Sequence, residues 1–315
     1  MRSLLTIILI LTLNFSLRAQ DTGRGFQLLE ISPTAYSLSK SEATTSIADG
    51  AASIYSNPAL LALNKFSSID LGYSAWVAGV NNIFGGVNFK SGKQAVAFSF
   101  YTSASDDYEQ RNNPGPANGT FSIGYISIAG AYAYDFDYFS LGGSFQFLNE
   151  QNFTYRANGY AFSAGIASQF LDERLRAGAS VSNLGEMDVL VNEATKLPAN
   201  FKIGLSADLI RFLPPKNDDL PVMVKLFTDY VYPLEEIDEK DFVDYKGSDP
   251  YLNLGLAFNI AEVIELSGGF KPQNDVRPIS FGASFMVSEL AFNYALIPFN
   301  TGYGTVHSIG LQYKF

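Results

Sequence analysis

Apolar and polar residues alternate with a period of two along most of this chain. In the segment 201–209, Phe201, Ile203 and Leu205 fall on one face, opposite Lys202 and Gly204. The same alternation recurs at 139–147, 252–260 and 308–315. Successive side chains of a β-strand point to opposite faces, so this pattern predicts strands with one apolar and one polar face.

Fourteen segments carry this pattern and are predicted as strands. They are 66–76, 81–91, 93–103, 120–133, 138–149, 157–170, 174–184, 198–210, 222–232, 250–260, 263–271, 278–286, 289–297 and 305–315. Short connections alternate with connections that are often longer, such as 104–119, 185–197 and 233–249. Outer-membrane barrels have short turns at the periplasmic end and longer loops outside, and an even strand number puts both termini in the periplasm.

The polar face decides between a membrane barrel and a soluble β-sandwich. It is rich in Gly, Ala, Ser and Asn, and charged residues make up only 17% of the chain. A soluble sandwich would turn a charged face to water, whereas small residues suit the interior of a curved barrel. The fold class predicted is therefore all-β, a transmembrane antiparallel β-barrel of about 14 strands.

Two local features refine this prediction. The fourth strand changes parity after Tyr125, which predicts a β-bulge there. Aromatic residues gather at strand ends and predict girdles at the two membrane interfaces. They are Tyr73, Trp76, Tyr101, Tyr230, Tyr232, Tyr251 and Phe315.

The first 65 residues do not show the strand pattern. Residues 1–19 combine Arg2, an apolar run from Leu4 to Phe15 and a small Ala19, which predicts a signal peptide for export to the bacterial outer membrane. Residues 20–65 are small, polar and rich in turns. Irregular backbone is tolerated at membrane depth inside a barrel, so this segment is predicted to plug the lumen of a barrel formed by residues 66–315; a periplasmic tail is the alternative.

Charge and rare residues exclude several functions. The formal charge is −10, and no cysteine is present. Nucleic acid is excluded as a partner because phosphate binding needs a basic patch. His307 is the only histidine and shares parity with the outward Ile309. A catalytic triad or a zinc site is therefore not expected, and we predict a protein that is not an enzyme and has no cofactor, catalytic residue or metal site.

Two groups of charges remain as candidates. An acidic stretch runs from Glu235 to Asp249, and it is either a solvated loop or a cation site. Parity places another group of charges toward the lumen, where they either line a conduit or pair with each other and with the plug. They are Asp70, Lys90, Arg176, Lys202, Asp208, Lys225, Asp229, Glu265, Lys271 and Lys314.

The N-terminal segment resembles the opening of the PorV/PorQ family of FadL-like outer-membrane barrels. The resemblance rests on residues 25–35, 42–51 and 53–62, which include Ala48-Asp49-Gly50 and Asn57-Pro58-Ala59, and on 197–206. Where relatives have a Gly-rich stretch, this chain has Ser37 to Ala43. The resemblance implies a fourteen-strand barrel with Asn57, Pro58 and Ala59 in the plug.

The resemblance also implies one of two roles. Some relatives are components or accessories of type IX protein secretion, which is the main prediction. Its partners would be secreted cargo proteins or other secretion components. The alternative is FadL-like transport of hydrophobic small molecules. Outer-membrane lipid is an expected partner in both cases.

Overall fold

The computed structural model describes residues 26–105, 108–111, 115–190, 192, 194–212, 220–234 and 249–315. The predicted signal peptide lies outside these residues. Of the acidic stretch, residues 235–248 also lie outside them.

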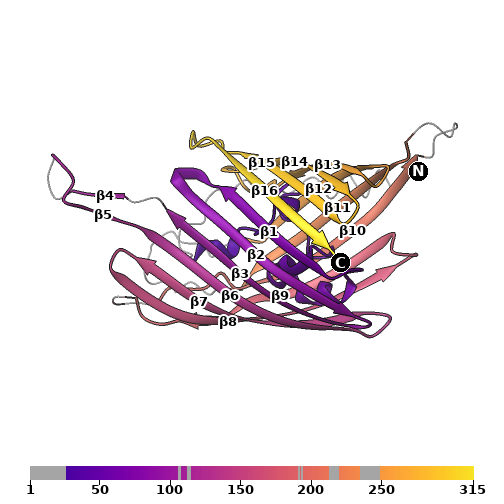
Figure 1. The fold of residues 1–315 in the computed structure, drawn as a ribbon, viewed down its shortest axis with the longest axis horizontal. Coiled ribbons are helices and arrows are strands. Elements are labelled where there is room, and N and C mark those ends of the chain that lie inside the picture. Colours follow the sequence, from indigo (N-terminus) through magenta and orange to yellow (C-terminus); the bar gives the residue numbers. More distant parts are fainter. Residues whose placement is uncertain are drawn as a thin grey trace.

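Fourteen antiparallel strands close into one barrel in simple chain order (Figure 1). Its strands are β1 (Ser68–Ala75), β2 (Val80–Ser91), β3 (Gln94–Ser105), β6 (Ile123–Asp135), β7 (Ser140–Asn152), β8 (Tyr155–Phe170), β9 (Leu175–Met187), β10 (Asn200–Phe212), β11 (Val222–Pro233), β12 (Tyr251–Ile260), β13 (Ile264–Phe270), β14 (Ile279–Val287), β15 (Leu290–Pro298) and β16 (Thr305–Lys314). β16 pairs with β1 and leaves no free edge. The predicted fold class is confirmed.

The register follows the predicted alternation, but the bulges lie elsewhere than predicted. No bulge lies at Tyr125, because β6 pairs with β3 and β7 in unbroken register. Tyr125 points inward because the lumen is apolar at that level, where its ring packs on Phe26. Bulges lie instead between Phe162 and Ala164 and between Asp208 and Ile210.

The barrel wall is much taller on one side than on the other. β8 has 16 residues, whereas β13 has only 7. We call the end that carries the connections 76–79, 188–199 and 271–278 the long-loop end, and the opposite end the short-turn end. A hairpin of β4 (Tyr108–Gln110) and β5 (Gly119–Phe121) projects beyond the long-loop end.

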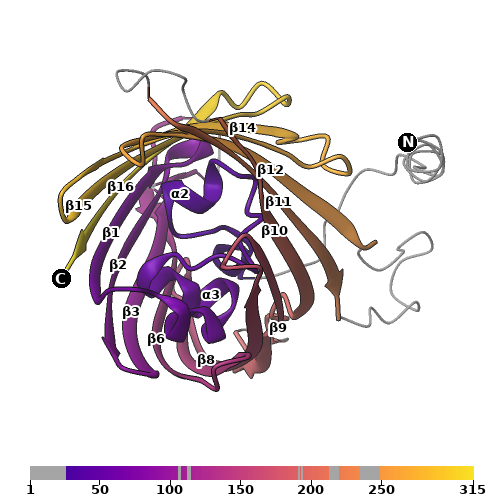
Figure 2. The same cartoon turned by 90° about the vertical axis from the view of Figure 1, so that its right-hand side faces the viewer.

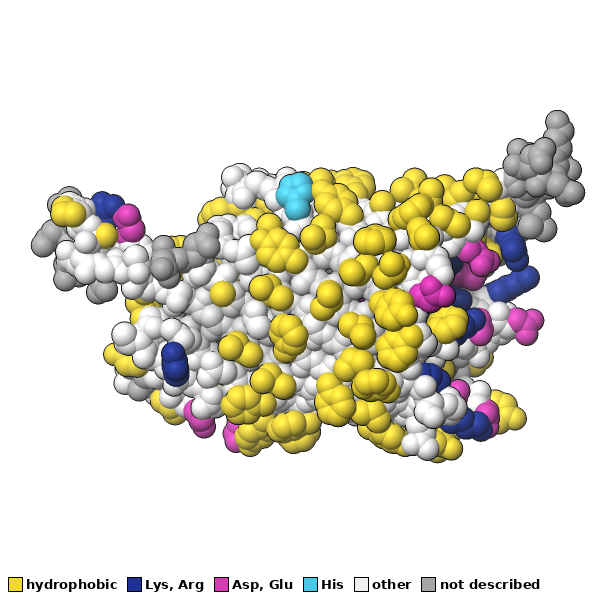
Figure 3. All heavy atoms as spheres, viewed as in Figure 1, with side chains coloured by type: hydrophobic (Ala, Val, Ile, Leu, Met, Phe, Trp, Pro, Cys, Tyr) yellow, Lys and Arg dark blue, Asp and Glu magenta, His cyan; other side chains and the backbone are white. Residues whose placement is uncertain are grey.

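The outer wall is apolar. Leu71, Phe98 and Ile128 are about half exposed on the outer face, which is the expected surface of a wall that faces lipid. Figure 3 shows hydrophobic side chains over the visible wall and charged side chains at the end opposite the hairpin. Among the predicted girdle residues, Tyr73, Tyr230 and Tyr232 are exposed on the outer wall. The prediction for Tyr101 is wrong, because its side chain is buried in the lumen. No helix in the described ranges is long and apolar enough to cross a membrane.

Residues 26–64 lie inside the barrel and are called the plug here (Figure 2). Its short helices are η1 (Gln27–Glu30), α2 (Ala35–Leu38), η2 (Gly50–Ala52), α3 (Ser53–Ser56) and η3 (Pro58–Leu63). A further turn, η4 (Val77–Gly79), joins β1 to β2. Plug residues such as Ala35, Ile54 and Leu61 are fully buried, so the plug is packed tightly against the wall.

Glycines on the inner wall make this packing possible. A Cβ on Gly142 would lie 2.5 Å from the Pro58 carbonyl carbon, and one on Gly269 would lie 2.4 Å from the Ser41 nitrogen. Nine described wall glycines approach the plug in this way, and we call them the luminal glycine belt. They are Gly72, Gly86, Gly142, Gly165, Gly178, Gly204, Gly255, Gly269 and Gly282. The plug backbone therefore lies directly on the strand backbones.

Candidate functional site

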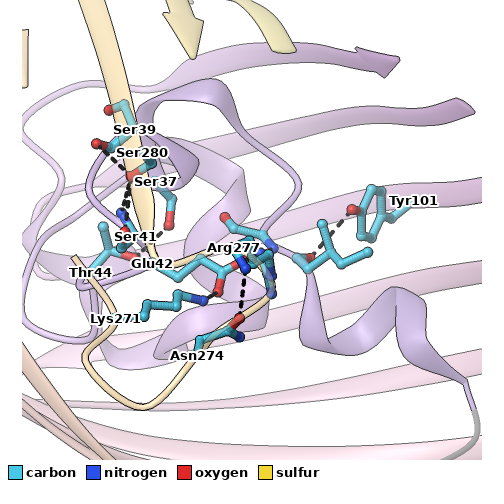
Figure 4. Close-up of polar contacts among 12 residues, drawn as sticks. Ser37, Ser39, Ser41, Glu42, Thr44, Tyr101, Lys271, Asn274, Arg277 and Ser280 are labelled. Carbon is cyan, nitrogen blue, oxygen red and sulfur yellow. Dashed lines mark hydrogen bonds and ion pairs between the residues drawn. The ribbon is translucent and has the colours of Figure 1, made fainter. Parts of the chain in front are cut away.

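One attachment of the plug is the turn Ser39–Glu42, which lies against β13 and β14 (Figure 4). The Ser41 hydroxyl and the Ser280 hydroxyl are 2.9 Å apart, and the Ser41 N–H donates to the same Ser280 oxygen. The Ser267 hydroxyl donates to the Ser39 hydroxyl at 2.8 Å. We call this turn the latch. It holds the plug to the shortest strand of the barrel.

A buried ion pair fixes the latch toward the short-turn end of β13. Lys40 Nζ lies 2.9 Å from Glu265 Oε1, and Lys225 Nζ lies 3.9 Å from the other Glu265 oxygen. Lys40 Nζ also lies 3.4 Å from the centre of the Tyr36 ring. Burial lowers the pKa of Lys40, and the Glu265 charge opposes that shift. A charge this deep is retained only because it is paired.

A second charged cluster fixes the latch at the long-loop end. The Glu42 carboxylate pairs with Lys271 and, at 3.1 Å, with Arg277. Burial alone would raise the pKa of Glu42, but the Arg277 and Lys271 charges hold it well below its usual range. Arg277 also lies over the Trp76 ring. The cluster thus ties the plug to the loop that follows β13.

The predicted plug motif lies where the plug meets β7 and β8. Asn57 Nδ2 donates to the carbonyls of Thr45, at 2.9 Å, and of Ile166, at 3.1 Å. Asn57 Oδ1 accepts the Ala59 N–H, which caps η3, and Pro58 occupies the first turn of that helix. The motif is therefore placed as a structural joint between two parts of the plug and the wall.

The ten predicted luminal charges all lie on the inner side of the wall or at its rim, and several contact the plug. Asp229 accepts from the N–H and hydroxyl of Thr45, Asp70 accepts from the Ala51 N–H, and the Lys90 ammonium donates to the Ala62 carbonyl. Glu265 and Lys271 bind Lys40 and Glu42 as described. Arg176 pairs with Asp208 at 3.2 Å. Lys202 and Lys314 influence the neighbouring carboxylates of Asp229 and Asp70 through their charge.

A cluster of buried apolar side chains lies near the long-loop end of the lumen. It includes the rings of Tyr55, Phe84, Tyr101 and Tyr125. Leu148, Met187 and Leu197 pack against these rings. Phe26 and Leu28 of the plug lie within this cluster, and we call the space that they occupy the mouth pocket. The sequence did not reveal it, because Tyr101 and Tyr125 were assigned to the girdle and to a bulge.

The chain itself fills the mouth pocket. Phe26 is fully buried and meets the Tyr125 ring edge to face at 5.0 Å, and Leu28 is buried beside it. Phe26 has a φ of 52°, a left-handed conformation that an ordinary side chain adopts rarely. The helix η1 that follows has no side-chain cap. The mouth pocket therefore holds Phe26 and Leu28 by apolar contacts, whereas buried ion pairs fix the latch.

His307 lies on the outer face, where its Nδ1 is 2.7 Å from the Tyr294 hydroxyl. Within the described ranges no group of three His, Cys, Asp or Glu side chains is arranged to hold a metal ion.

Solved structures of similar fold are outer-membrane barrels. The toluene transporter TodX of Pseudomonas putida matches with a TM-score of 0.57 and 11% identity over 90% of this chain and 98% of that one. The monoaromatic hydrocarbon channel CymD matches with a TM-score of 0.57 and 12% identity over 92% of this chain and 99% of that one. A FadL homologue of Pseudomonas aeruginosa matches with a TM-score of 0.50 and 10% identity over 90% of this chain and 98% of that one. No protein-family model matches the sequence, and no curated protein matches it.

These matches define the fold of this protein. The chain folds as a fourteen-strand barrel with a plug, and its fold is similar to that of these FadL-like outer-membrane barrels. Identities near 11% establish the fold alone, so the function has to be argued from the lumen.

Proposed function

We propose that this protein carries hydrophobic small molecules across the bacterial outer membrane. The observation that carries the proposal is the mouth pocket, an apolar, aromatic-lined site near the long-loop end that is filled by Phe26 and Leu28 of the chain itself. Small-molecule sites are typically concave and lined by apolar and aromatic side chains. The proteins of similar fold include a toluene transporter and a monoaromatic hydrocarbon channel, which supports this function.

The Phe26 side chain indicates the size of the molecule that the pocket accepts. Its single ring touches Tyr125 edge to face, a geometry that aromatic pairs favour. When η1 withdraws, the vacated volume fits one aromatic ring or a short branched alkyl group. The substrate then has to pass the rest of the plug, which is packed tightly against the wall, so transport requires the plug to move.

Uptake of radiolabelled toluene tests this proposal in a host that lacks its own FadL-like barrels. Wild-type protein should raise the initial rate several-fold over the empty vector. Leu148→Lys, which places a charge in the pocket, should abolish this gain, whereas Leu71→Ala, which only shortens an outward side chain of β1, is the control and should keep it. A wild-type rate equal to the vector rate would refute the proposal.

A role in type IX secretion is the second candidate. It rests on the resemblance of residues 25–63 and 197–208 to the PorV/PorQ family. An affinity pull-down from the native outer membrane distinguishes the two functions. Co-purified exported proteins that share a C-terminal domain would establish secretion, whereas a barrel that carries only a bound apolar molecule supports transport.

A further inference from the structure

A hollow interrupts the apolar outer wall over β12, β13 and β14. Its volume is about 530 Å³ and its rim is apolar. At its centre is Gly268, which pairs with Leu256 on one side and Phe281 on the other. Leu266 and Phe270 lie two residues away along β13 on the same outer face. Four large apolar side chains therefore surround Gly268, which has no side chain of its own.

Local packing does not require a glycine at position 268. A Cβ there would meet nothing closer than the Ser280 carbonyl oxygen at 3.6 Å, and the backbone does not have a positive φ. The neighbouring Gly269, by contrast, belongs to the luminal glycine belt and would collide with Ser41. Gly268 thus leaves space on the outside that a larger residue would fill without strain.

Two other outward glycines, Gly85 and Gly130, have their space filled by a neighbouring ring. A Cβ on Gly85 would strike the Phe100 ring, and one on Gly130 would lie 3.6 Å from the Phe98 ring. Cross-strand aromatic cover of this kind compensates for a glycine in a sheet. Phe281 does not cover Gly268 in this way, since its nearest ring atom would be 3.9 Å from the Cβ. The hollow therefore remains open.

The hollow opens to the membrane and not to the lumen. Directly behind it, the latch closes the inner face through the Ser41–Ser280 and Ser39–Ser267 hydrogen bonds. A Cβ on Gly255 would lie 3.1 Å from the Lys40 Cβ, so the latch also covers that point of the wall. A molecule in the hollow is therefore in contact with lipid and separated from the transport route.

The bilayer beside this wall must adapt to a short strand. The 7 residues of β13 rise roughly 18 Å when each adds about 3.4 Å and the strand is tilted by about 40°. The apolar band of such barrels is about 25 Å tall. A wall shorter than the hydrocarbon thickness is matched by local thinning of the bilayer. Acyl chains beside β13 are therefore shortened or tilted toward the wall.

We propose that the hollow at Gly268 binds one acyl chain of an outer-membrane phospholipid. The rim offers hydrocarbon contacts from Leu256, Leu266 and Phe281, and its lining carries no charged side chain. A chain tilted by the thinned bilayer gains these contacts without leaving the hydrocarbon. The proposal does not rest on the transport function, because the latch separates the hollow from the lumen.

Native mass spectrometry of the whole barrel, released from its own outer membrane in mild detergent, tests this site. Wild-type protein should retain one phospholipid under activation that strips the remaining lipids. Gly268→Leu fills the hollow and should lower that retained fraction at least tenfold. Gly143→Leu is the matched control, because Gly143 is also outward and open but is flanked by Tyr132 and Ala164. The Gly143→Leu variant should retain the lipid.

Heat-modifiable gel mobility shows whether each variant is folded. A second variant tests the site without changing Gly268. Phe281→Ala keeps Gly268 and lowers one rim of the hollow, so it should also release the lipid. Equal retention by wild type and Gly268→Leu would overturn the proposal. So would a bound apolar molecule other than a lipid that is lost in Gly268→Leu, since it would assign the hollow to the transported substrate.

Discussion

Lys40 of the plug and Glu265 of β13 form an ion pair whose atoms are 2.9 Å apart, with side chains 0% and 5% exposed. Removing one member of a buried pair leaves an uncompensated charge, whereas removing both is often tolerated. Lys40→Met should therefore destabilise the barrel by about 3 kcal/mol. The double variant Lys40→Met/Glu265→Met should recover most of that loss.

The free energy of unfolding in urea, measured in lipid vesicles, checks this prediction. Trp76 is the single tryptophan of the chain and reports unfolding by its fluorescence. If the single and the double variant lose the same free energy of unfolding, the pair does not act as a unit.

The Glu42 cluster should control how firmly the plug closes the lumen. Glu42→Gln leaves Lys271 and Arg277 beside each other without a carboxylate, so the latch should loosen at the long-loop end. Planar-bilayer recordings should then show channel openings that wild type lacks. Glu262→Gln, an exposed change at the short-turn end, is the control and should stay closed. Silent recordings from Glu42→Gln would argue against a closing role for the cluster.

Asn57 should be essential for the seating of the plug. Asn57→Ala removes a helix cap and two donated hydrogen bonds, at a cost of about 2 kcal/mol. Asn57→Asp keeps the cap and loses only the two donated hydrogen bonds, so its loss of stability should be intermediate. Limited proteolysis measures release of the plug, and Asn64→Ala, which loses one contact of 3.5 Å, is the control. Equal protection of the Asn57→Ala and wild-type plugs would contradict the joint described here.

Adjacent glycines on β7 test the luminal glycine belt. Gly142→Ala pushes a methyl group into the Pro58 carbonyl, whereas Gly143→Ala points outward into open space. The first change should cost about 1–3 kcal/mol, and the second should be nearly neutral. Urea unfolding of both variants measures the difference. If the two variants behave alike, the plug does not lie on the strand backbone at this point.

Asp49 should make stability depend on pH. Burial raises the pKa of Asp49 to about 6, and the Thr34 hydroxyl that donates to it opposes the shift. An unfolded aspartate titrates near pH 4, so the folded state holds this proton more tightly and loses stability as pH rises from about 4 to 6. Asp49→Asn should remove this component, seen as a smaller change in thermal midpoint between those pH values. Asp275→Asn, in an exposed loop, should leave the pH dependence of wild type unchanged.

The sequence predicted the barrel well because a strand in a closed membrane barrel has only two environments. Ile203 and Leu205 face lipid while Lys202 and Gly204 face inward, so parity alone places them. Each of the fourteen predicted strands lies within three residues of an observed one. The prediction failed where the plug changes the inner environment, as at Tyr101 and Tyr125, whose inward rings pack in the mouth pocket.

The site was only partly accessible from the sequence. The luminal charges could be placed by parity, but their partners Lys40, Glu42 and Thr45 lie in irregular backbone that has no period. The inner glycines were attributed to barrel curvature, whereas most of them make room for the plug. Nothing in the alternation distinguishes Gly268 from the inner glycines except its parity.

A disulfide between plug and wall is the most direct test of the account. The Ser41 and Ser280 hydroxyls are 2.9 Å apart, so Ser41→Cys/Ser280→Cys brings two sulfurs close to the ~2 Å bond they would form. The chain has no other cysteine to interfere. Toluene uptake by the oxidised double variant should fall to the vector rate and return on reduction, with both single variants unaffected. Uptake that persists with the latch locked would contradict a route that requires the plug to move.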